Sequence, residues 1–150
     1  SRCILSLPSD FLFDSGSADL KQKHLENLSR FLREIRTRYE LEGDVIRVEG
    51  HTDDVPMGKK LKYANNWELS VARATNVGVF MIEKNGYDPD LISITGHADT
   101  RPRVSYTSET GQRKLGKVLK EARKANRRVD LIFARPAASE QIRRFFPEQE

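Results

Sequence analysis

The sequence predicts an α+β fold, an α/β two-layer sandwich in which a mixed four-stranded sheet carries helices on one face. Short runs with the length and patterning of strands lie at 45–49, 91–95 and 129–133. Apolar residues recur every three or four positions along 20–39, and a second helical segment follows from about residue 66. With one more strand near the N-terminus, the order is strand, helix, strand, helix, strand, possible helix, strand. That order favours one helical layer on the sheet.

Length and composition indicate one ordinary globular domain. The chain has 150 residues, of which 37% are hydrophobic and 32% charged, and a domain of this size can bury a core. We expect a single domain over 1–150, with its core at about 3–134 and a tail or short helix at 136–150. No apolar run approaches the roughly 20 residues that cross a bilayer. Because the chain begins with Ser1, we expect any export signal or membrane anchor to lie outside it.

Capping residues predict where the two long helices begin and end. Ser17 is a good N-cap, and the amphipathic helix that it predicts runs for about six turns to Tyr39. Asn65 or Asn66 is expected to begin the second helix, and Gly86 to end it. Apolar residues occupy nearly every face of the second helix, so we expect it to be buried on more than one side.

The segment 113–125 is strongly basic and could form a helix with one apolar side. The net charge of +4 for the whole chain favours an anionic partner without selecting one. Nucleic acid is not favoured, because no aromatic side chains interleave with the basic residues and no helix-turn-helix pattern is present. The apolar side of this predicted helix would consist of Leu115, Val118, Leu119 and Ala122.

A Gly-His-x-Asp sequence follows a predicted strand twice, at 50–53 and at 96–99. If the two strands were neighbours, two histidines and several carboxylates would converge at one edge of the sheet. Histidine and carboxylate suit zinc, iron or manganese, so one hypothesis is a metal-dependent enzyme. The alternative is that these are turn residues bonded to nearby backbone. The metal ligands would be His51, Asp53, His97 and Asp99.

An acid and a guanidinium could face each other across a cleft. Asn66 and Arg73 are two helical turns apart, so both could face the loop that carries Asp53. A carboxylate on one wall and a planar guanidinium on the other could hold a zwitterion, the acid taking an ammonium and the arginine a carboxylate. The alternative is a plain Asp53–Arg73 salt bridge that positions the loop. Residue types alone leave both open.

Motifs of catalysis and of cofactor binding are missing from the sequence. There is no Gly-rich phosphate loop, no Gly-x-Ser-x-Gly elbow and no evident nucleophile–base pair. The single cysteine, Cys3, excludes an intrachain disulfide and a cysteine-rich zinc site. We therefore expect a protein that is not an enzyme and has no cofactor.

Three motifs, in order along the chain, resemble those of OmpA-like peptidoglycan-binding domains. They are Gly-His-Thr-Asp at 50–53, Asn-Trp-Glu-Leu-Ser-Val-Ala-Arg-Ala at 66–74 and Asn-Arg-Arg-Val-Asp at 126–130. The Asn-Trp-Glu-Leu-Ser form, the Val-Pro pair at 55–56 and Leu-Phe-Asp-Ser-Gly-Ser-Ala at 12–18 are similar to the MotB-type stator branch of that family.

The resemblance, which extends from about Ser6 to Phe133, implies a mixed sheet with helices on one side and binding without catalysis. It implies that the ligand is the stem peptide of peptidoglycan, held chiefly at diaminopimelate. Asp53 would meet the ammonium of that residue and Arg73 its carboxylate. The other residues of the pocket would be Thr52, Asn66, Leu69 and Arg127.

The stator branch also implies a cellular setting and partners. The chain would be the periplasmic domain of an inner-membrane protein of the flagellar motor, a homodimer, with an ion-channel partner subunit reached through an N-terminal region outside this chain. One alternative is an anchor of a non-flagellar system, such as an outer-membrane lipoprotein, a secretion machine or another stator-like unit. The alternative from another class is a metal-dependent cell-wall hydrolase.

Two departures from the family are visible in the sequence. His97 stands where the family more often has an aromatic residue, which implies that the repeated Gly-His-x-Asp is incidental. The basic insertion at 101–125 is longer than the family usually carries, and its partner is not assigned.

Overall fold

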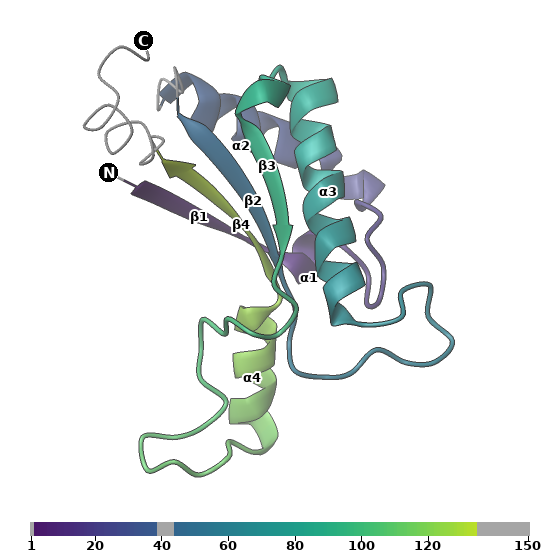
Figure 1. Ribbon diagram of the computed structural model, residues 1–150, viewed down its shortest axis with the longest axis vertical. Coiled ribbons are helices and arrows are strands. Elements are labelled where there is room, and N and C mark those ends of the chain that lie inside the picture. Colours follow the sequence, from purple (N-terminus) through teal and green to yellow (C-terminus); the bar gives the residue numbers. More distant parts are fainter. Residues whose placement is uncertain (1, 39–43, 135–150) are drawn as a thin grey trace, which may run out of the picture.

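The computed structural model describes residues 2–38 and 44–134, which form one sheet with helices packed on it (Figure 1). The order of the strands in the sheet is β1-β4-β2-β3. β4 is antiparallel to both of its neighbours, whereas β2 and β3 are parallel. The strands are β1 (Arg2–Pro8), β2 (Val45–His51), β3 (Ile92–Gly96) and β4 (Arg128–Ala134).

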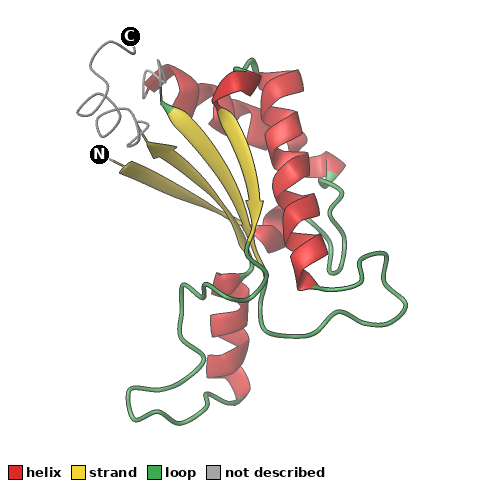
Figure 2. Ribbon diagram, in the orientation of Figure 1, coloured by secondary structure: helices red, strands yellow, loops and turns green. Residues whose placement is uncertain are grey.

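The hydrophobic core lies between the sheet and two long helices on one of its faces (Figure 2). Val48 of β2 pairs with Leu131 of β4, and both are fully buried. Leu32, Val77 and Met81 cover them from the helical layer. The predicted α+β class with a mixed four-stranded sheet is therefore confirmed. The helical elements are α1 (Ser9–Leu12), η1 (Gln22–His24), α2 (Leu25–Arg38), α3 (Asn66–Asn85), η2 (Pro89–Leu91) and α4 (Gly116–Asn126).

The first long helix, α2, begins well after Ser17, so the predicted N-cap is wrong. Ser17 Oγ instead accepts a hydrogen bond from the N–H of Asp19 at 3.1 Å, which closes a local turn. Phe13 and Leu20 form an isolated antiparallel bridge, which keeps the segment between them out of a helix. The backbone pairing of Phe13 with Leu20 has overridden the capping signal of Ser17 here. The predicted helix end at Tyr39 lies outside the described residues.

The second long helix, α3, has the predicted ends. Asn65 is its N-cap and accepts a hydrogen bond from the N–H of Glu68 at 2.9 Å. Gly86 ends it with φ 72°, a left-handed conformation that glycine adopts without strain. The expectation of burial on several sides is wrong, because one broad face is buried and another is open to solvent. The exposed apolar side chains of α3 are Trp67, Val71 and Val79.

The segment between β3 and β4 projects from the end of the sheet and contains α4 (Figure 1). We call residues 101–126 the arm. The predicted basic helix is present in it, but its apolar side is buried only near the sheet. Ala122 is 2% exposed, whereas Leu115 is 76% and Val118 57% exposed. The predicted tail at 136–150 lies outside the described residues, and no described helix is long and apolar enough to cross a membrane.

Two paired glycines let α3 approach the ends of β2 and β3 closely. Gly50 lies opposite Gly96 in the parallel register. A Cβ on Gly50 would lie 2.1 Å from the backbone oxygen of Ser70, and a Cβ on Gly96 would lie 2.6 Å from Ser70 Oγ. That Oγ accepts a hydrogen bond from the N–H of Ala98 at 3.1 Å. Glycine at both positions therefore sets how near the first turns of α3 come to the sheet.

Gly50→Ala should destabilise the fold, because its methyl group would displace the α3 backbone rather than a flexible side chain. We expect a loss of about 2–3 kcal/mol in the free energy of unfolding, the upper part of the range for overpacking. Gly58→Ala is the matched control, because its nearest neighbour is Leu61 Cδ1 at 3.7 Å, and it should change stability by less than about 0.5 kcal/mol. Urea unfolding measures both variants. Equal stabilities would contradict the close approach.

Candidate ligand-binding site

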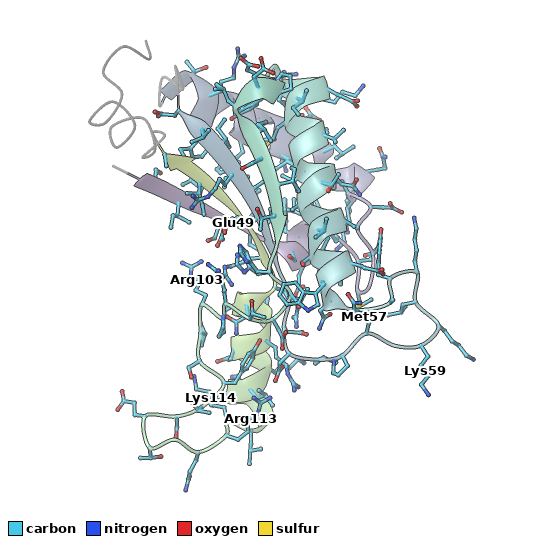
Figure 3. The ribbon with its side chains drawn as sticks, viewed as in Figure 1. Glu49, Met57, Lys59, Arg103, Arg113 and Lys114 are labelled. Carbon is cyan, nitrogen blue, oxygen red and sulfur yellow. The ribbon has the colours of Figure 1, made fainter. Side chains whose placement is uncertain are left out.

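A cavity of about 640 Å³ lies where the loop after β2, the start of α3 and the start of β4 meet. All six residues that the sequence analysis selected line it, namely Thr52, Asp53, Asn66, Leu69, Arg73 and Arg127. Sequence reasoning missed several others, among them Asp10, Asp14, Lys21, Met57 and Leu61. Figure 3 labels Met57 and Lys59 on the loop that forms the outer wall, with Lys59 pointing away from α3.

Asp53 is held in place on the loop that follows β2. Its Oδ1 accepts a hydrogen bond from the N–H of Val55 at 3.0 Å, and its Oδ2 accepts one from Arg127 Nη1 at 2.7 Å. Thr52 Oγ1 donates to the backbone oxygen of Asp53 at 2.9 Å. Asn66 Nδ2 donates to the oxygen of Val55 at 3.0 Å, which joins the loop to the first turn of α3. The carboxylate therefore has a fixed orientation at the cavity wall.

Arg127 joins two acids from distant parts of the chain. Its Nε and Nη2 bond the two carboxylate oxygens of Asp10, each at 2.9 Å, while Nη1 reaches Asp53. The hydrogen bond from Arg127 lowers the pKa of Asp10 against the opposing effect of burial. The hydrogen bonds from Asp10 and Asp53 raise the pKa of Arg127. Asp10 could not have been selected from the sequence, because its partner lies 117 residues away.

Arg73 is 5% exposed and is held by backbone oxygens rather than by an acid. Its Nε donates to the oxygen of Ser17 at 2.8 Å, and its Nη2 donates to the oxygen of Asp14 at 3.2 Å. The guanidinium also lies 5.0 Å from the centre of the Phe13 ring. Burial lowers its pKa, yet an arginine stays charged at any ordinary pH. The plain Asp53–Arg73 salt bridge is not formed among the described residues, since Asp53 pairs with Arg127.

The charges around the cavity are balanced, and Asp53 and Arg73 do not pair with each other. Three carboxylates, of Asp10, Asp14 and Asp53, line it together with three cations, of Lys21, Arg73 and Arg127. Such a lining suits a ligand that is itself a zwitterion, because ammonium and carboxylate groups each meet an opposite charge. It suits a polyanion poorly.

Asp54 connects the cavity loop to the arm. Its Oδ1 accepts a hydrogen bond from Arg123 Nε at 2.7 Å, and its Oδ2 pairs with Arg113. Burial alone would raise the pKa of Asp54, but the hydrogen bonds from the two arginines outweigh it and lower that pKa. The first and last parts of the arm are also joined, because Asn126 Oδ1 accepts hydrogen bonds from the N–H groups of Arg103 and Val104 at 2.8 Å.

The two Gly-His-x-Asp segments are neighbours in space, as expected if their strands pair. His51 and His97 stack with their ring centres 4.9 Å apart, at the ends of the paired strands β2 and β3. His97 Nε2 bonds Glu49 Oε1 at 2.7 Å. Of the predicted metal ligands, the two histidines come together, but the nearby carboxylate is Glu49 rather than Asp53 or Asp99.

Two arginines balance the acids of this histidine cluster. Arg47 Nε lies 3.5 Å from Glu49 Oε2, and Arg128 Nε donates to Asp130 Oδ2 at 3.1 Å. Asp130 also lies 3.5 Å from His51 Nε2. Glu49 lies near the end of the sheet from which the arm departs (Figure 3). The cluster therefore carries no excess of negative charge that a metal ion would be needed to neutralise.

The fold is that of a known class of domain. Residues 12–116 match the model of the OmpA family, and the chain belongs to that family. Within it, the resemblance to the MotB branch is confirmed. Motility protein B of Bacillus subtilis is 27% identical over 140 residues, which cover 91% of this chain and 47% of that protein. The chain spans about half the length of the curated relatives it matches.

Solved structures agree with this placement. The periplasmic domain of Helicobacter pylori MotB superposes with a TM-score of 0.73 at 26% identity, covering 97% of this chain and 92% of that one. The cell wall anchor of the T6SS from Pseudomonas aeruginosa superposes with a TM-score of 0.70 at 28% identity, covering 90% of this chain and 82% of that one.

Stability should fall with acid between about pH 6.5 and pH 4 because of His51. Burial, assisted by Arg128 and partly opposed by Asp130, lowers its pKa from 6.5 to about 4. As the pH falls, the unfolded chain therefore binds a proton before the folded chain does, and folding loses roughly 2–3 kcal/mol. His51→Gln should remove this part of the pH dependence in urea unfolding at pH 7 and pH 4.5. His24→Gln, a partly exposed histidine stacked on Phe11, should retain it.

Proposed function

We propose that this chain binds the stem peptide of peptidoglycan at diaminopimelate, without catalysis, and so anchors a larger protein to the cell wall. The observation that carries the proposal is that Asp53 and Arg73 line one cavity from opposite elements and do not pair with each other. Diaminopimelate has an ammonium and a carboxylate at the end of its side chain, which matches a site of separated charges.

The geometry suggests how each end of the ligand would be held. Arg73 Nε and Nη2 bond backbone oxygens, while Nη1 has no hydrogen bond within residues 2–38 and 44–134. That N–H edge would bind the ligand carboxylate. The ammonium would bind Asp53, whose carboxylate is oriented by Val55 and Arg127. Leu69 and Met57 would pack against the methylene groups between the two ends.

The relatives support the role of a cell-wall anchor, but they belong to different assemblies. Likeness to Motility protein B and to MotB periplasmic domains favours a stator-like protein of the flagellar motor, with this chain in the periplasm. On that basis the chain would form a homodimer and reach its ion-channel partner through a region outside these residues. Likeness to the cell wall anchor of the T6SS supports the non-flagellar alternative.

A metal-dependent wall hydrolase is the second candidate, and the histidine cluster is the observation that favours it. Ligand atoms of Glu49, His51 and His97 lie within 4.8 Å of one another, and His51 Nδ1 is buried without a hydrogen-bond partner among the described residues. Elemental analysis of the purified chain separates the two candidates. One transition-metal ion per chain, together with release of wall fragments, would favour the hydrolase over the anchor.

Asp53→Asn and Arg73→Lys should each weaken binding to purified peptidoglycan about tenfold or more, because each removes a charge-assisted contact. Asn keeps the shape of Asp, and Lys keeps the buried charge, so the fold should survive both changes. Asp90→Asn, on the surface at η2, is the control and should bind like the unaltered chain. Co-sedimentation with peptidoglycan measures affinity, and circular dichroism checks folding. Undiminished binding by both variants would overturn the proposal.

A further inference from the structure

The positive charge of this protein is concentrated in the arm. Residues 101–126 contain eight Lys and Arg and two Glu, a net charge of +6, whereas the rest of the chain has a net charge of −2. The cavity is balanced in charge, so the zwitterion site does not require this excess. An excess of one sign on a projecting element attracts and orients a partner of the opposite sign.

The lysines of the arm form an exposed stripe along α4. Lys117, Lys120 and Lys124 are three and four residues apart, which places them on one side of the helix, and all three are exposed. Only Lys117 has an ion pair among the described residues, with Glu121 at 4.0 Å. Like charges at these spacings destabilise a helix. The stripe is therefore unfavourable in the free protein, and an anionic partner would relieve the repulsion.

The arm holds this stripe in a fixed relation to the cavity. Asp54 pairs with Arg113 and Arg123 of the arm, and the neighbouring residue Asp53 lines the cavity. On α4, Arg123 faces Asp54, while the lysines lie on another side and stay exposed. The loop after β2 therefore carries Asp53 for the ligand in the cavity and Asp54, whose two ion pairs clamp the arm.

We propose that the lysine stripe of α4 is a second contact with peptidoglycan, one that binds carboxylates of stem peptides adjacent to the one in the cavity. This rests on the proposed function, because the clamp at Asp54 brings the stripe to the polymer that the cavity would hold. Lys117 and Lys124 are about 10 Å apart along the helix axis. The stripe therefore suits a polymer with repeated anionic groups better than a single small anion.

The test compares a single stem peptide with the intact polymer. The arm variant is Lys117→Gln with Lys120→Gln and Lys124→Gln. The control variant is Lys23→Gln with Arg30→Gln and Lys84→Gln, which removes the same charge from exposed positions on the helical layer. Binding of a soluble diaminopimelate-containing stem peptide is measured by calorimetric titration. Binding of peptidoglycan stripped of phosphodiester polymers is measured by co-sedimentation at about 50 and about 300 mM salt. These concentrations lie below and above the roughly 0.1 M at which charges are screened beyond about 10 Å.

The arm variant should bind the stem peptide as the unaltered chain does but bind peptidoglycan about tenfold more weakly at low salt. Its affinity should also depend less on salt. Replacing the same three lysines with arginine should restore binding. Equal loss in the control variant, or loss of stem-peptide binding in the arm variant, would overturn the inference. So would an effect that appears only on unstripped walls, because the partner would then be a phosphodiester polymer.

Failure of the proposed function gives a different pattern. In that case the unaltered chain does not bind the soluble stem peptide at all, and Asp53→Asn changes nothing. The inference about the arm fails when the stem peptide binds normally and the three lysines make no difference to sedimentation.

Discussion

The contact of the α3 backbone with two strand ends is the constraint on which the rest of this structure depends. Gly50 and Gly96 lie side by side in β2 and β3, and Ser70 fills the space that a side chain on either would occupy. Because α3 cannot lie further from the sheet without losing the Ser70–Ala98 hydrogen bond, its first turns are held beside the loop after β2. This contact places Arg73 and Asp53 on one cavity.

Consecutive acids on that loop then connect three distant parts of the chain. Asp53 pairs with Arg127, just before β4, and Arg127 pairs with Asp10 near the N-terminus. Asp54 pairs with two arginines of the arm. Charged groups lose hydration when they are partly buried, so each must be paired with good geometry to be tolerated. The result is a cavity wall held by ion pairs to three distant parts of the chain.

The histidine cluster illustrates a different use of polar residues. Because side chains alternate along a strand, Val48 enters the core while Glu49 and His51 lie on the opposite side of β2. There His51 stacks on His97 and lies beside Asp130, and Glu49 bonds His97, so neither side chain faces water. The cluster holds together the strand ends from which the cavity loop and the arm depart.

Periodicity, caps and short motifs are local signals, so the order of elements, the ends of α3 and the six cavity residues could be predicted from the sequence alone. It could not supply Asp10, whose role depends on a partner 117 residues away, or the true start of α2, where the Phe13–Leu20 bridge overrides Ser17. It also left open whether Asp53 and Arg73 pair. They do not pair, because the folded chain brings Arg127 to Asp53 and backbone oxygens to Arg73 from segments far apart in the sequence.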